Sequence, residues 1–126
     1  MLLTALAILC VTACLGLWLV GQILMTDTPP AGIGWKQIVH GLAGAVGVAL
    51  AYLALSGPGR GHGAGKFGWT AFILLAGALL GGVTILVAQL RRRDAPGTLI
   101  AAHASIAVAG FVLLAAYYTT PISYGR

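Results

Sequence analysis

The chain has 126 residues, of which 60% are hydrophobic and only 7% are charged. A soluble domain carries about 25% charged residues, so this composition excludes one and predicts an integral membrane protein. Seven Lys and Arg residues outweigh two acidic residues, which gives a net charge of +5. Most of the basic residues fall at the ends of apolar runs, so we expect them to contact lipid phosphates and we do not expect nucleic-acid binding.

Four apolar runs are each long enough to cross the hydrocarbon layer of a bilayer, which takes about 20 helical residues. They extend from Leu2 to Leu24, from Gln37 to Leu55, from Phe67 to Leu90 and from Thr98 to Tyr118. The segments between them are rich in proline, glycine or charge and therefore end each helix. Short connections make consecutive helices antiparallel neighbours. The sequence thus predicts one all-α domain over residues 1–126, an up-down four-helix bundle.

The basic residues also predict an orientation in the membrane. Lys36 and the triplet Arg91, Arg92 and Arg93 lie on the side of the first and third loops, whereas Arg60, Lys66 and Arg126 lie on the other side. Because cytoplasmic loops carry the excess of Lys and Arg, we expect loops one and three in the cytoplasm and both termini outside.

The first apolar run contains both cysteines of the chain. Residues 11–14 look like a lipoprotein cleavage box, but the apolar run continues beyond Cys14, so we expect a spanning helix. Cys10 and Cys14 lie four residues apart on one helical face. Since no further cysteine can complete a soft-metal site, we expect small buried thiols rather than copper or redox chemistry.

The two halves of the chain repeat one pattern. The first and third runs each have a glutamine near their last residue, Gln22 and Gln89, and the second and fourth each have a histidine near their start. Small residues follow each histidine at the fourth and seventh positions, namely Gly44 and Gly47 after His40, and Ala107 and Gly110 after His103. Offsets of 63 to 67 residues therefore predict two repeated helical hairpins.

The repeat predicts that the two histidines lie at one depth in the bundle. The second and fourth helices run in the same direction, and each histidine lies roughly 6–10 Å inside the start of its helix. Two level imidazoles beside small residues are typical of haem ligation, because iron takes one nitrogen on each face of the ring and the porphyrin needs room. We therefore predict one haem, with His40 and His103 as its axial ligands and Gly44, Gly47, Ala107 and Gly110 lining it.

Polar residues at the same end of the bundle complete the predicted site. Gln22 and Gln89 can accept the second imidazole proton and so fix the tautomer, a role that a backbone carbonyl fills equally well. Lys36 and the triplet Arg91, Arg92 and Arg93 can bind the carboxylates of a haem near the membrane surface. His62 lies in a glycine-rich loop, where we expect no role in metal binding.

Other functions also fit two intramembrane histidines. A neutral histidine can simply hydrogen-bond a neighbouring helix, as in a structural or assembly subunit of a membrane complex. A histidine can also bind the magnesium of a chlorophyll from one face. A proton relay in a small transporter is the weakest alternative, because no acidic residue lies in the predicted helices.

A histidine on the second and fourth helices, each preceded by a helix that ends in glutamine, resembles the four-helix b-type cytochromes of bacterial membranes. The pattern is also similar to one half of haem A synthase. It rests on Gln22 with His40 and Gln89 with His103, and it implies haem b and the cytoplasmic membrane of a bacterium. Two-haem cytochromes carry four ligand histidines, so two here imply one haem. The catalytic acid of haem A synthase has no counterpart in the predicted helices.

The expected function follows from the prediction that His40 and His103 occupy both axial positions of the haem iron. Such an iron has no open position for oxygen or substrate, which favours an electron carrier over an enzyme. Little of the chain lies outside the predicted helices, so we expect a subunit of a larger membrane complex. We expect it to pass electrons between a partner protein and the quinone pool.

Overall fold

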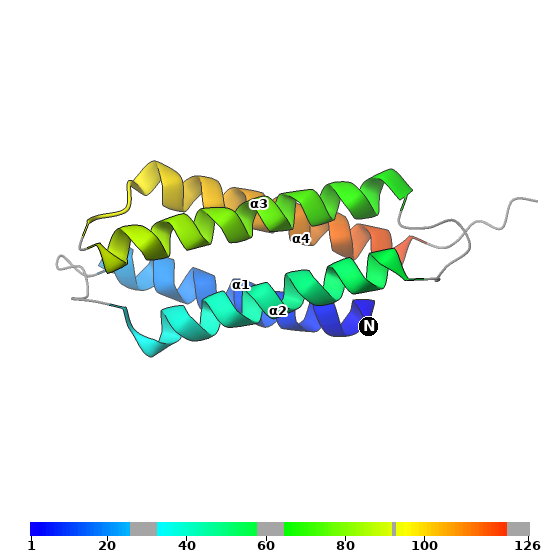
Figure 1. Cartoon of the computed structure of the whole chain (residues 1–126), viewed down its shortest axis with the longest axis horizontal. Helices are drawn as coiled ribbons and strands as arrows, with labels where there is room; N and C mark the ends of the chain where they lie inside the picture. Colours follow the sequence, from blue (N-terminus) through cyan, green and yellow to red (C-terminus); the bar gives the residue numbers. More distant parts are fainter. Residues whose placement is uncertain (26–32, 58–64, 92, 121–126) are drawn as a thin grey trace, which may run out of the picture.

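Four α-helices make up the described part of the chain, and they lie side by side in an up-down arrangement (Figure 1). They are α1 (Leu2–Met25), α2 (Trp35–Ser56), α3 (Gly65–Leu90) and α4 (Gly97–Thr119). This computed structural model describes residues 1–25, 33–57, 65–91 and 93–120, and those ranges contain no strand. The predicted all-α class is confirmed. Each helix is long and apolar enough to cross a membrane, which indicates a multi-pass membrane protein.

The helices extend slightly beyond the apolar runs that predicted them. The second, third and fourth helices begin one or two residues early, at Trp35, Gly65 and Gly97. Helical hydrogen bonds continue past the last apolar residue, as where the N–H of Thr120 donates to Ala116 at 2.9 Å. At the start of α2, the side-chain oxygen of Gln37 accepts from the N–H of Gly34 and caps the first turn.

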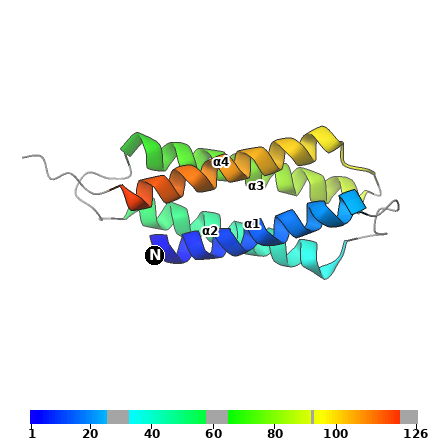
Figure 2. The ribbon, with the colours of Figure 1, turned by 180° about the vertical axis from the view of Figure 1, so that it is seen from behind.

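The helices pack most closely as two hairpins, α1 with α2 and α3 with α4. The hairpins contact each other more sparsely, through α2 with α3 and α1 with α4. Figures 1 and 2, which view the bundle from opposite sides, show this same order of helices. In the described residues no comparable packing joins α1 to α3 or α2 to α4. The helices α2 and α4 therefore face each other diagonally across the bundle.

The buried residues lie toward the end of the bundle where the chain starts. The apolar core there consists of Ala5, Leu6, Leu9, Val48, Ala51, Leu55, Ala71, Leu75 and Leu114. No residue whose burial is described in the ranges 13–25, 33–46, 79–91 and 93–109 is buried. Those ranges form the other end of the bundle, which is consequently loosely packed.

An aromatic cluster joins the two hairpins at the packed end. The ring of Tyr52 in α2 lies 6.2 Å from the ring of Trp69 and 5.5 Å from that of Phe72, both in α3, between centroids. Trp69 and Phe72 are themselves 5.8 Å apart, edge to face. Such pairs stabilise by about 0.5–1.5 kcal/mol each. The cluster therefore strengthens the sparse contact between α2 and α3.

Gly110 allows α4 to approach α3 closely, which gives the first prediction. A Cβ atom at Gly110 would lie 3.0 Å from the backbone nitrogen of Leu75 and 2.9 Å from its Cγ. We expect Gly110→Ala to push the helices apart and lower the free energy of unfolding by about 1–3 kcal/mol. Unfolding in mixed detergent and SDS measures this change.

Gly77→Ala is the matched control for Gly110→Ala. Nothing lies within 4 Å of a Cβ atom at Gly77, so only the better helix propensity of alanine, up to about 1 kcal/mol, should act there. Equal stability of the two variants would contradict the close α3–α4 contact at Gly110.

Candidate functional site: a facing pair of histidines

His40 in α2 and His103 in α4 meet across the centre of the bundle. Their ring centroids are 6.1 Å apart and their planes form an angle of 75°. Both side chains are partly buried, and both lie at the loosely packed end. The structure thus brings together the two residues that the repeat predicted at one depth.

Each imidazole is held by a backbone carbonyl of the other helix in its own hairpin. Nδ1 of His40 lies 2.9 Å from the carbonyl oxygen of Thr12 in α1, and Nδ1 of His103 lies 2.7 Å from that of Ala78 in α3. A carbonyl oxygen only accepts, so Nδ1 donates and carries the proton in both rings. Nε2 is then the nitrogen with a free lone pair, the form in which an imidazole binds a metal ion.

A glycine lies against each imidazole. A Cβ atom at Gly16 would lie 2.9 Å from Cε1 of His40, and one at Gly82 would lie 3.1 Å from Cε1 of His103. A helical side chain covers the turn before its own Cα atom, so a side chain at Gly16 or Gly82 would also cover the carbonyl four residues earlier. Glycine therefore leaves the carbonyls of Thr12 and Ala78 open to the histidines.

The two hairpins make these contacts at matching positions. Thr12 and Ala78 are 66 residues apart, as are Gly16 and Gly82, while the histidines are 63 residues apart. Gly16 and Gly82 were not among the predicted site residues, although the same offset relates Thr4 and Thr70. If the 66-residue offset is applied along the whole of α1 and α3, it pairs Gly16 with Gly82 and would have identified both as repeated positions.

The predicted lining residues lie on the histidines' own helices, and the three glycines among them contact the neighbouring helix of the hairpin. A Cβ atom at Gly44 would lie 3.4 Å from Cγ2 of Thr12, and one at Gly47 would lie 2.7 Å from Cδ2 of Leu9. Gly110 meets Leu75 in the same way, and Ala107 is partly buried. These positions hold α1 against α2 and α3 against α4, and a role in lining a cofactor stays a prediction.

The two glutamines do not hold the imidazoles, because the carbonyls of Thr12 and Ala78 accept both Nδ1 protons. Gln22 is exposed near the end of α1, and Gln89 is partly buried near the end of α3. The sequence allowed either a glutamine side chain or a backbone carbonyl as the acceptor for each imidazole. In both hairpins the acceptor is the backbone carbonyl.

The cations of the site lie at the same end of the bundle as the histidines. Lys36 is one helical turn before His40, and its Nζ lies 4.2 Å from the ring centroid of Trp18 in α1. This is a cation–π contact. Arg91 and Arg93 are exposed beyond the end of α3, and Arg92 lies outside the described residues.

The remaining candidate metal ligands do not join the histidine pair. His62 and Asp27 lie outside the described residues. Cys10 and Cys14 are free and exposed on α1, so the prediction that they are buried is wrong. Both side chains therefore lie on a face of α1 that points away from the apolar core. Within the described residues, no group of three or more His, Cys, Asp or Glu side chains could hold a metal ion.

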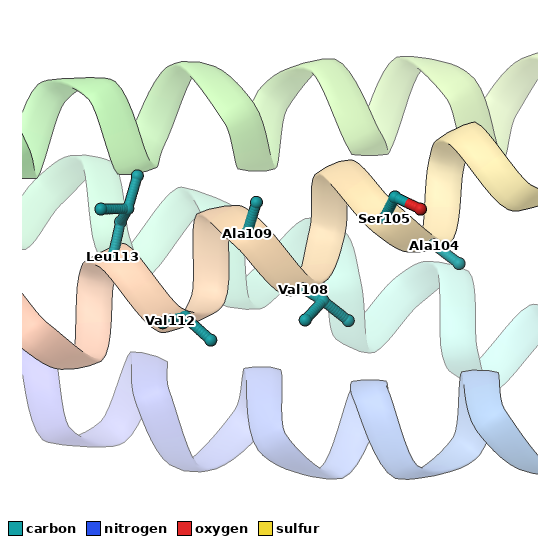
Figure 3. Close-up of a pocket in the computed structure, with 6 residues that line it drawn as sticks. All are labelled: Ala104, Ser105, Val108, Ala109, Val112 and Leu113. Atoms are coloured by element: carbon teal, nitrogen blue, oxygen red, sulfur yellow. The ribbon is translucent and has the colours of Figure 1, made fainter.

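A shallow groove of about 670 Å³ runs along the outer face of α4 (Figure 3). Its lining is apolar except for one hydroxyl and consists of Ala104, Ser105, Val108, Ala109, Val112 and Leu113. His103, Ala107 and Gly110 face inward instead. The groove is therefore separate from the histidine pair.

Comparisons with protein-family models, with curated proteins and with solved structures found no match for this chain. The function must accordingly be inferred from the site. Two imidazoles that bind one metal ion from opposite sides have ring centroids about 6 Å apart, since each metal–nitrogen bond is about 2 Å and the nitrogen lies about 1 Å from the centroid. The observed 6.1 Å agrees with that spacing.

The hydrogen bonds of the two rings predict their tautomer. With Nδ1 donating to a carbonyl in each hairpin, His40 and His103 should both be the Nδ1–H form when neutral. Nitrogen-15 NMR of histidine-labelled, cofactor-free protein in detergent at pH 8 measures this, with free histidine in the same buffer as the control. Two Nε2–H signals from the helical histidines would contradict the carbonyl contacts.

Proposed function

We propose that the chain is a membrane-embedded b-type cytochrome subunit that carries single electrons through one haem b. His40 and His103 are the axial ligands of its iron. The observation that supports this most strongly is the pair of imidazoles 6.1 Å apart, each with Nδ1 bonded to a backbone carbonyl. Ligand histidines almost always donate their second ring N–H in this way, which fixes the ring and leaves Nε2 for the metal.

The donor set fits an iron porphyrin better than a bare metal ion. Two neutral imidazoles without any carboxylate or thiolate leave a divalent ion with too few ligands, whereas a porphyrin supplies the other four nitrogens itself. Asp94 is the single acidic residue that the structure describes, and it is exposed in the loop before α4. The histidine pair therefore lacks the third and fourth ligands of a zinc site.

The packing of the bundle also suits a flat group between the histidines. His40 belongs to one hairpin and His103 to the other, and the hairpins contact each other sparsely. Beyond Thr12 and Ala78, the ranges 13–25, 33–46, 79–91 and 93–109 contain no residue described as buried. Because a macrocycle lies across the line that joins its axial ligands, it would occupy the seam between the hairpins. Gly44, Gly47 and Gly110 pack within their own hairpins and would act on such a group only by setting how closely each histidine's helix approaches its neighbour.

The carboxylates of the haem need cations, and the described residues at this end of the bundle include Lys36, Arg91 and Arg93. Lys36 lies one turn from His40, and Arg91 and Arg93 follow α3. Arg92 lies between those two arginines in the sequence and outside the described residues, and we propose the same role for it. A lysine on an exposed tryptophan ring gains only about 0.5–1 kcal/mol from that contact, so Lys36 can leave Trp18 for a carboxylate. The proposed site thus places its anionic edge toward the aqueous surface.

Electron transfer is the chemistry that such a site allows. With His40 and His103 holding both faces, a bound haem would supply one-electron chemistry and would have no open position for oxygen or substrate. For the electron donor or acceptor we propose another protein or a lipid-soluble carrier such as a quinone. We therefore propose a subunit of a larger complex in the bacterial cytoplasmic membrane.

The two ligands can be tested separately by absorption spectroscopy. We expect purified protein to show one haem b per chain and a sharp α band after reduction by dithionite. His40→Ala and His103→Ala should each abolish the band, because a haem with one protein ligand is weakly held. His62→Ala, which changes the third histidine of the chain, is the control and should keep it. Colourless protein, or far-red bands of a chlorophyll, would refute the proposal.

Occupation of both axial positions predicts inertness toward carbon monoxide. We expect carbon monoxide to leave the spectrum of the reduced protein unchanged, because it binds only where a ligand position is open. A globin, whose haem iron has a single histidine ligand, serves as the positive control, since it binds the gas. A shifted Soret band in the unaltered protein would indicate that one histidine is not a ligand.

A further inference from the structure

We infer that Gly16 and Gly82 are positioning residues that hold the two imidazole planes nearly perpendicular and so determine the electronic state of the iron between them. The observation is the angle of 75° between the rings of His40 and His103. This inference rests on the proposed haem function and adds to it the residues that orient the ligands.

Each imidazole plane is fixed at two points. Nδ1 bonds a carbonyl of the neighbouring helix, at 2.9 Å for His40 and 2.7 Å for His103. The Cε1 edge of the ring rests against the glycine one turn later, where a Cβ atom would come within 2.9 Å at Gly16 and 3.1 Å at Gly82. A ring held at Nδ1 and at Cε1 cannot rotate freely about its Cβ–Cγ bond.

Both fixed points of each ring lie within one hairpin. Thr12 and Gly16 belong to α1 and hold the histidine of α2, while Ala78 and Gly82 belong to α3 and hold the histidine of α4. These two helix pairs are the closely packed ones, whereas the contact between hairpins is sparse. A group that enters between the hairpins can change their separation without turning either ring within its own hairpin. The near-perpendicular arrangement is therefore a property of the protein itself.

The angle between axial imidazoles has a direct electronic consequence. Each imidazole interacts with the iron d orbital that lies perpendicular to its own plane. Two imidazoles in parallel planes interact with the same iron d orbital, which separates that orbital in energy from its otherwise similar partner. Two imidazoles in perpendicular planes interact with one of the two d orbitals each, which leaves the two orbitals close in energy. Ligand orientation is thus one of the means by which a protein tunes a haem, alongside ligand identity and hydrogen bonding.

Low-temperature EPR of the oxidised protein measures the energy separation of these two iron d orbitals. Near-perpendicular imidazoles give a single low-spin feature at unusually high g, whereas near-parallel imidazoles give three well-separated lines. We expect the first type of spectrum from the unaltered protein. Because the two hairpins hold their histidines alike, we expect substitution of either glycine to change the spectrum in the same direction.

The variants are Gly16→Ala and Gly82→Ala, with Gly21→Ala and Gly77→Ala as controls on the same two helices. A Cβ atom at either control position has no other atom within 4 Å, so both controls should keep the unaltered spectrum. Gly82→Ala is the milder test variant, because a shift of a few tenths of an ångström relieves its contact at 3.1 Å. Size-exclusion chromatography checks that each variant remains folded.

The inference predicts that Gly82→Ala retains haem and moves the high-g feature toward the three-line form. Three lines from the unaltered protein, or an unchanged spectrum in both test variants, would overturn it. Loss of haem from both folded test variants would also overturn it, because a rotated imidazole should still bind iron. A colourless unaltered protein would instead overturn the proposed function.

Discussion

The hydrogen bond from each imidazole to a backbone carbonyl is the interaction on which the histidine site depends. A helical carbonyl already accepts one hydrogen bond within its helix, and its second lone pair is normally covered by the side chain four residues later. The glycines at positions 16 and 82 remove that cover. The carbonyl is reached only if the helices of a hairpin approach closely, which Gly47 against Leu9 and Gly110 against Leu75 allow. Packing near one end of the hairpin thus positions a hydrogen bond nearer the other.

The two hairpins are equivalent at the histidines and unlike elsewhere. The carbonyl and glycine contacts match in both, but the position that corresponds to Lys36 is Leu99 and the one that corresponds to Trp18 is Thr84. The aromatic cluster around Tyr52 likewise joins α2 to α3, whereas the matching residue in α4 is Ala115. The two histidines are therefore held alike, while the surroundings of the pair differ on its two sides.

The helices and the histidine pair were predictable from sequence because both follow from simple periodicity. Apolar length predicts a spanning helix, and a fixed offset places His40 and His103 at one depth. The partners of the imidazoles were harder, because the register between two helices is set by side-chain packing that a single sequence does not reveal. The chain has 19 glycines, and the sequence alone does not distinguish Gly16 and Gly82 from the glycines that follow the histidines. Burial of Cys10 and Cys14 was predicted wrongly because both faces of α1 are apolar.

The contrast between the packed end and the histidine end explains how the fold could hold the proposed haem ligands in place before a haem binds. Nine residues from all four helices form the core at one end, so the other end need not be filled for the bundle to form. An N–H without an acceptor is rarer in buried sites than an acceptor without a donor. In the histidine pair the donor Nδ1 atoms are bonded, and the atoms left open are acceptors. The proposed site is consequently tolerable without its haem, and the two imidazoles would need no reordering when the haem binds.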